Sequence, residues 1–223
     1  MVNVQDVDVI NMKKIIFLII LFLIYSAIIC FCPVVTQWDR NIIMAIQDLL
    51  KNVPLWIPML LDTQIYASCI IIPLIIGFIF FYKRLLIIDL LLFSSAPLVA
   101  YILNSIIKIA VQRPRPPLEL QIAVHPSSFS FVSSHTFISC SLWGLVIFYL
   151  VKYCSNKYIK YSGICFSVLW MFFVGFSRVW LGVHNPTDVL GGYFLALILL
   201  IIYIKTIRII LLYVTIVIKT YLY

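Results

Sequence analysis

Charged residues are scarce in this chain. Only 11% of its 223 residues are charged and 64% are hydrophobic, whereas a soluble domain is about 25% charged and about 45–50% apolar. This composition excludes an ordinary soluble domain and indicates a polytopic membrane protein. The length suits a single domain that takes in residues 1–223.

Acidic residues are especially few, with eight Asp and Glu in the whole chain. Only Asp188 and Glu119 lie near a histidine in the sequence, so no carboxylate cluster is available to hold a divalent metal ion. No pair of the six cysteines has zinc-finger spacing. We interpret them as small core residues, and the sequence leaves open whether Cys30 and Cys32 are oxidised. We therefore expect neither a metal ion nor a cofactor.

Long apolar runs predict an all-α fold, a bundle of six membrane-spanning helices. The first run, Ile15–Val35, is long enough to span, and a cleavable signal peptide is the competing interpretation. A last apolar piece, Ile209–Ile218, is too short to span and is expected at the surface or packed on the bundle. The other five predicted spans are 65–82, 85–108, 135–151, 161–177 and 186–204.

The stretch between the first two spans, residues 36–64, has an amphipathic pattern. Its apolar residues fall on one helical face and most of its charged residues fall elsewhere, which predicts an external helix lying on the membrane surface. Trp38 and Trp56 flank it as interfacial anchors. A surface loop with a short helix is the alternative. The apolar face consists of Ile42, Ile46, Leu49, Leu50 and Val53, and the polar residues are Asp39, Arg40, Asn41 and Asp48.

Lys and Arg are shared unevenly between the two membrane faces. Six spans put both termini on one face, and most of the sixteen basic residues belong to that face. The positive-inside rule then places the termini in the cytoplasm. The opposite face carries His125, His135 and His184 and would look outward. The inner-face residues are Lys13, Lys14, Lys83, Arg84, Lys152, Lys157, Lys160, Lys205, Arg208 and Lys219.

Arg178, His184 and Asp188 lie close together at the junction of two apolar runs. An ionisable group at the edge of a membrane span is costly, so such a group is a candidate functional residue. Asn185 is a good N-cap and Pro186 a good first helical residue, which predicts a helix start with His184 just before it. Asp188 would then reach the His184 ring, as a carboxylate does in a catalytic triad. The alternative is that Asp188 only caps the helix.

A second basic cluster, Lys108, Arg113 and Arg115, leads into a proline-rich loop. Residues before proline avoid the helical region, so Arg113 and Arg115 are expected on extended backbone. Fixed cations with many donors suit a phosphate dianion, although a loop that contacts lipid headgroups is equally compatible.

Ser133, Ser134 and His135 form a third cluster at the start of the fourth span. A helix N-terminus is a ready anion site, and a histidine beside it can deliver a proton. Plain helix capping with an interfacial histidine is the alternative.

Together these clusters resemble the three-part signature of the type 2 phosphatidic acid phosphatase superfamily, which includes vanadium haloperoxidases and bacterial acid phosphatases. The matching parts are Lys108-x6-Arg115-Pro116, Ser133-x-His135 and Ser177-Arg178-x5-His184-x3-Asp188, within about residues 35–205. One position departs from the family pattern, because Ser134 stands where Gly is usual, and Gly's conformational freedom is lost there.

The resemblance implies a metal-independent membrane phosphatase that forms a phosphohistidine. His184 would attack phosphorus, Asp188 would orient its ring, and His135 would protonate the leaving oxygen. The phosphoryl oxygens would be bound by Lys108, Arg115, Arg178, Ser133 and Ser134. Arg113 matches no position of the signature.

The implied substrate is a phosphate monoester or pyrophosphate of a membrane lipid, hydrolysed at the periplasmic face of a bacterial-type inner membrane. By analogy with enzymes that have short loops, undecaprenyl pyrophosphate or lipid A phosphate comes first, then phosphatidylglycerol phosphate or phosphatidate. The net charge of +8 reflects the membrane surface and not a nucleic-acid partner. The alternative class is a transporter or channel that binds an anion with the same Lys, Arg and His residues.

Overall fold

The computed structural model describes residues 12–63, 75, 87–122 and 125–222. In this part of the chain the only regular secondary structure is helical, so the predicted all-α fold is confirmed. Among the described residues, five helices are long and apolar enough to cross a membrane: α1 (Met12–Phe31), α5 (Ile87–Val111), α6 (Ser134–Tyr153), α7 (Lys157–Trp180) and α8 (Pro186–Leu222). The remaining predicted span, 65–82, lies outside the described residues apart from position 75.

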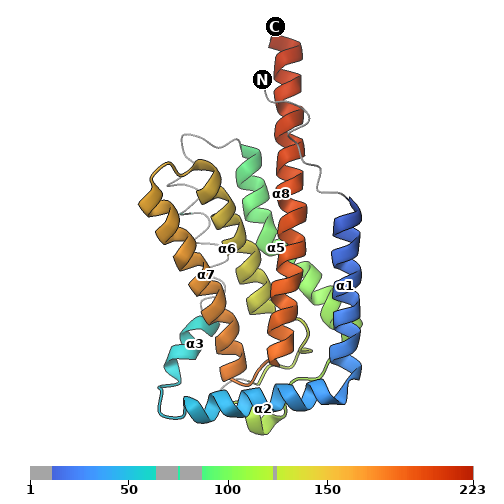
Figure 1. The fold of residues 1–223 in the computed structure, drawn as a ribbon, viewed down its shortest axis with the longest axis vertical. Coiled ribbons are helices and arrows are strands. Elements are labelled where there is room, and N and C mark those ends of the chain that lie inside the picture. Colours follow the sequence, from blue (N-terminus) through green and yellow to red (C-terminus); the bar gives the residue numbers. More distant parts are fainter. Residues whose placement is uncertain (1–11, 64–74, 76–86, 123–124, 223) are drawn as a thin grey trace.

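Helix α6 is the centre of the bundle and packs against α5, α7 and α8 (Figure 1). It is apolar nearly all round, as a helix buried on several sides must be. Phe93 of α5, Leu142 and Tyr149 of α6, and Leu199 of α8 share one hydrophobic core with Phe131 from the preceding loop. Between helices in lipid, such close packing replaces the hydrophobic effect as the main source of association.

Helix α2 (Pro33–Leu49) lies across one end of the bundle, and the short α3 (Trp56–Thr63) follows it and packs beside α7 (Figure 1). The first span ends earlier than the predicted Val35, because α1 ends at Phe31 and Pro33 begins α2. A helix is present in the stretch predicted to be amphipathic, and Trp38 and Trp56 are both exposed.

The predicted placement of Asp39 on the outer, polar side of this helix is wrong. Asp39 is completely buried, and with Ile43 it forms the face of α2 that meets the bundle. Ile42 and Ile46 pack around Ile43, whereas Leu49 is largely exposed. A buried carboxylate needs partners, and the structure supplies them from the loop after α5 and from the start of α8.

The last apolar piece is not a separate segment, which corrects a second prediction. Helix α8 runs without interruption from Pro186 to Leu222 and extends past the other helices (Figure 1). No Gly or Pro occurs between Tyr193 and Leu222. The predicted span 186–204 ends close to the apolar part of α8, which reaches Thr206, and the helix itself continues past Lys205 and Arg208 because charged residues do not stop a helix.

The two ends of the bundle differ. The turn between α6 and α7 and the C-terminal end of α8 lie at one end, and α2 lies at the other (Figure 1). Residues 112–133, which include the 3-10 turn Leu118–Leu120, connect α5 to α6, and residues 181–185 connect α7 to α8. An ion pair and hydrogen bonds tie α2 to the first connection, to the last residue of α7 and to the start of α8.

Candidate active site

The turn between α7 and α8 positions His184. Its sharpest point is Gly182, whose φ is +67°, a left-handed conformation that suits glycine. A Cβ atom at this position would overlap the carbonyl oxygen of Leu120. The amides of Val183 and His184 both donate to the carbonyl oxygen of Arg178, at 3.2 and 3.3 Å. Helix α8 then begins at Pro186, as predicted.

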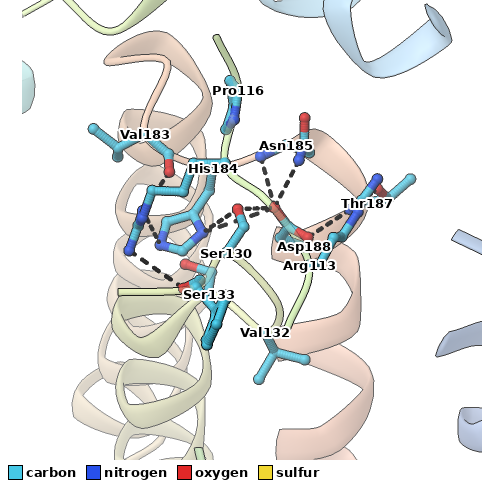
Figure 2. Close-up of polar contacts among 12 residues, drawn as sticks. Arg113, Pro116, Ser130, Val132, Ser133, Val183, His184, Asn185, Thr187 and Asp188 are labelled. Atoms are coloured by element: carbon cyan, nitrogen blue, oxygen red, sulfur yellow. Dashed lines mark hydrogen bonds and ion pairs between the residues drawn. The ribbon is translucent and has the colours of Figure 1, made fainter. Parts of the chain in front are cut away.

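His184 is buried, with Asp188 on one side (Figure 2) and Arg115 on the other. Its Nδ1 atom lies 3.8 Å from Asp188 Oδ2 and 3.4 Å from Ser130 Oγ. Its Nε2 atom lies 3.4 Å from Nη1 of Arg115. The ring therefore turns Nε2 toward the basic residue that is expected to bind phosphate.

Asp188 is completely buried, and four donors hold its carboxylate (Figure 2). Oδ2 accepts from Ser130 Oγ at 2.6 Å, from the Asn185 amide at 2.9 Å and from Asn185 Nδ2 at 3.1 Å. Oδ1 accepts from Arg113 at 2.5 Å. The two interpretations of Asp188, as a helix cap and as the partner of His184, are therefore compatible. Asp188 caps α8 through Asn185 and also faces the His184 ring.

Arg115 is fixed by main-chain acceptors. Its Nε donates to the carbonyl oxygen of Ser128 at 2.7 Å, and Nη1 donates to the carbonyl oxygen of Val183. Burial lowers the pKa of Arg115 to about 10, so the guanidinium remains charged at neutral pH. Lys108, near the end of α5, donates to the carbonyl oxygen of Phe129 in the same loop. Both cations therefore share the Phe129 carbonyl oxygen as an acceptor, and Arg115 is the one in contact with His184.

The His184 ring is uncharged at neutral pH. Burial lowers its pKa to about 3, Arg115 and Lys108 contribute in the same direction, and Asp188 opposes them. An uncharged imidazole keeps a lone pair on the nitrogen that carries no proton. If Nδ1 carries the proton toward Asp188 and Ser130, Nε2 is free to act as a nucleophile.

Helix α6 begins at Ser134 with Ser133 as its N-cap. Ser133 is buried; its amide donates to the carbonyl oxygen of Asp188 at 3.2 Å, and its hydroxyl accepts from Thr136 at 3.0 Å. The predicted helix start is therefore present and joined to α8. His135 lies in the first turn of α6 and is partly exposed.

Ser134 fits its position without the freedom of glycine. It is the first residue of α6, and it is not among the described residues with a positive φ. Its hydroxyl donates to Asn104 Oδ1 at 2.8 Å, and Asn104 Nδ2 donates to the carbonyl oxygen of Val132 at 3.1 Å. Ser134 thus ties the start of α6 to α5.

Arg178 is buried at the end of α7. Its guanidinium donates to Ser177 Oγ at 3.1 Å and to the carbonyl oxygen of Pro58 in α3 at 3.4 Å. Burial is the main cause of the lowered pKa of Arg115, and the positive charge of Arg178 lowers it further. The hydrogen bonds of Arg178 hold its guanidinium at the end of α7 and against α3.

A cavity of about 240 Å³ adjoins Arg115 on the side of α2. It lies between the α1–α2 junction and the proline-rich loop, and Arg40, Arg115 and Asn185 are among its lining residues. In the described part of the chain, no group of three or more His, Cys, Asp or Glu side chains is arranged to hold a metal ion. The five described cysteines, Cys30 and Cys32 included, are free.

The sequence profile of the PAP2 superfamily matches residues 89–210, which contain all three parts of the signature. The chain belongs to the PAP2 superfamily. It is 37% identical to phosphatidylglycerophosphatase B of Bacillus subtilis over 144 residues, 61% of this chain and 68% of that protein. It also resembles the crystal structure of a transmembrane PAP2-type phosphatidylglycerolphosphate phosphatase from Bacillus subtilis, with a TM-score of 0.72 and 28% identity over 87% of this chain and 96% of that one.

These similarities confirm the resemblance seen in the sequence. This PAP2 protein is a membrane lipid phosphatase, and the transporter or channel alternative is not supported. The individual residue roles stay predictions, although the structure brings Arg115, His184 and Asp188 into contact distance.

Sequence reasoning missed several residues that hold this PAP2 site together. Ser130 contacts both His184 and Asp188, Asn104 anchors Ser134, and Asp39 binds Arg113. Ser130 and Asn104 carried no distinguishing signal, because each is one of many polar residues near a helix end. Asp39 carried one, since a carboxylate is rare in a chain with eight acidic residues.

Proposed function

We propose that this PAP2 phosphatase hydrolyses the terminal phosphate of phosphatidylglycerol phosphate, at the outer face of the membrane, through a phosphohistidine on His184. One observation carries the mechanism: the buried His184 ring lies between Asp188 and Arg115. Similarity to a phosphatidylglycerophosphatase supports the choice of lipid.

The proposed reaction has two steps. Nε2 of His184 attacks phosphorus, the bond from phosphorus to the lipid oxygen breaks, and His135 protonates that oxygen. Water, activated by His135, then attacks the phosphohistidine and releases inorganic phosphate. Asp188 stabilises the positive charge that develops on the ring. The charge on the phosphoryl oxygens is stabilised by Lys108, Arg115, Arg178, Ser133 and Ser134.

The order of substrates differs from the one predicted by loop length, which favoured undecaprenyl pyrophosphate or lipid A phosphate. Loop length is an analogy, whereas the similarity to the Bacillus subtilis protein extends over 144 residues. Phosphatidylglycerol phosphate therefore comes first, and the other lipids remain as competitors.

The test is phosphate release by the detergent-purified protein from a panel of four lipids in the presence of EDTA. We expect the highest kcat/KM on phosphatidylglycerol phosphate, activity without added metal, and inhibition by vanadate, which mimics the transferring phosphoryl group. A higher kcat/KM on undecaprenyl pyrophosphate, phosphatidate or lipid A phosphate would overturn the choice of substrate. Activity that disappears in EDTA and returns with metal would overturn the mechanism.

A further inference from the structure

Arg113 joins helix α2 to the carboxylate of Asp188. Its Nη1 lies 2.5 Å from Asp188 Oδ1, and its Nη2 lies 2.8 Å from Asp39 Oδ2. Arg113 is 5% exposed, and both carboxylates are 0% exposed. One guanidinium thus bridges two buried acids that are 149 positions apart along the chain (Asp39 and Asp188).

Thr187 completes the connection between Asp39 and the start of α8. Its amide donates to Asp39 Oδ1 at 3.1 Å and its hydroxyl donates to Asp39 Oδ2 at 2.6 Å. Arg113 also donates to the Thr187 hydroxyl at 2.8 Å. Asp39 therefore binds both neighbours of Asp188: Arg113, which contacts its carboxylate, and Thr187, which precedes it in the sequence.

We propose that Asp39 and Arg113 are positioning residues for catalysis, which fix the place and charge of Asp188 and thereby orient His184. The inference rests on the proposed function of His184 and Asp188. Neither residue touches the reacting atoms, and both act through the Asp188 carboxylate.

The charges explain why the bridge matters for the reaction. Two carboxylates share one guanidinium, so the buried group keeps one negative charge in excess. Attack on phosphorus makes the His184 ring positive, and that excess charge stabilises the ring. Burial disfavours the charged form of Arg113, but Asp188 and Asp39 outweigh this and raise its pKa, so the bridge stays charged.

The bridge can be separated experimentally from simple docking of α2. A second contact holds α2 to the bundle, because Gln47 Nε2 donates to the carbonyl oxygens of Leu120 and Trp180 at 2.8 and 3.0 Å. Gln47→Ala weakens docking without removing a charge near Asp188. Asp39→Asn has the same shape as the native residue but removes the shared charge. Gln47→Ala is therefore the matched control.

The experiment measures steady-state kinetics on phosphatidylglycerol phosphate micelles and the ring ¹⁵N signals of histidine-labelled protein. For Asp39→Asn we expect kcat to fall on the order of 10–100-fold, the usual size for residues that orient a functional side chain, with KM unchanged. The His184 ring signals should shift. Arg113→Lys keeps the charge but lacks the planar guanidinium, so we expect the same lower kcat, unchanged KM and shifted His184 signals. This variant replaces Asp39→Asn in the test if Asp39→Asn does not fold. Gln47→Ala should lower only the unfolding temperature.

Unchanged kcat and unchanged His184 signals in the folded variants would overturn the inference. Equal losses of kcat in Gln47→Ala and Asp39→Asn would also overturn it, since the effect would then come from the docking of α2 and not from the charge of Asp39. The ring signals do not depend on turnover. If the wild-type protein fails to hydrolyse the lipid while Asp39→Asn still shifts the His184 signals, the proposed substrate fails and the positioning role stands.

Discussion

At the scale of single residues, Asp188 and His184 form a unit because they are close in sequence. His184 lies just before α8 and Asp188 lies in its first turn, four positions later, so the local start of one helix brings the two side chains together. This is why their pairing could be predicted from the sequence. The contacts of Asp188 with Arg113 and Ser130 cross 75 and 58 positions, and no local rule predicts them.

The uncharged state of His184 leads to a prediction about pH. The pKa of His184 is lowered from 6.5 to about 3, so the folded protein binds fewer protons than the unfolded chain between these values. The contribution of His184 to the free energy of unfolding is fully present above pH 6.5 and is lost as the pH falls from 6.5 to about 3. We expect the ¹⁵N signals of His184 to remain those of a neutral ring down to about pH 4. Assignment is simple with three histidines in the chain, and a titration near pH 6.5 would contradict the account.

At the scale of elements, the turns and loops position more of the site residues than the membrane spans do. The helix starts at Ser134 and Pro186 were predictable from their caps, and the structure has both. The inward face of α2 was not predictable, because the apolar pattern placed Asp39 outside and its partners come from distant elements. The predicted span 186–204 agrees with the apolar part of α8, Pro186–Thr206, but the helix continues to Leu222, because basic residues end a span without ending a helix.

Gly182 provides a test of the turn that carries His184. Gly182→Ala places a Cβ in a left-handed conformation and against the carbonyl oxygen of Leu120. The conformation alone costs about 1–2 kcal/mol, and the displaced turn moves His184, so we expect a lower unfolding temperature and a large loss of kcat. Gly163→Ala in α7 is the control, since its Cβ meets only the end of the Leu150 side chain. An active, equally stable Gly182→Ala protein would show that this turn is not required.

At the scale of the whole molecule, the site lies at one end of the bundle and the α6–α7 turn and the C-terminal end of α8 lie at the other (Figure 1). Composition and hydropathy were sufficient to predict a helical membrane bundle, since five predicted spans correspond to described helices. Which end faces the cytoplasm is a separate prediction that depends on the distribution of Lys and Arg.

A pair of reporter fusions tests this orientation. A reporter fused after Tyr223 should behave as cytoplasmic, and one inserted beside Glu119, next to the site loop, should behave as external. The distribution of Lys and Arg is the physical reason. The opposite pattern would reverse the bundle and place the proposed chemistry inside the cell.

The central claim is that His184 is the nucleophile and His135 the acid, and trapping the phosphoenzyme tests it most directly. Labelled substrate should give an acid-labile, base-stable phosphoprotein with the wild type and none with His184→Ala, after gel filtration has shown that both are folded. His135→Ala should lose about 10²–10⁴-fold in kcat on a lipid alkoxide, which needs a proton to leave, and much less on nitrophenyl phosphate. Label retained by His184→Ala, or equal losses for His135→Ala on both substrates, would contradict the account.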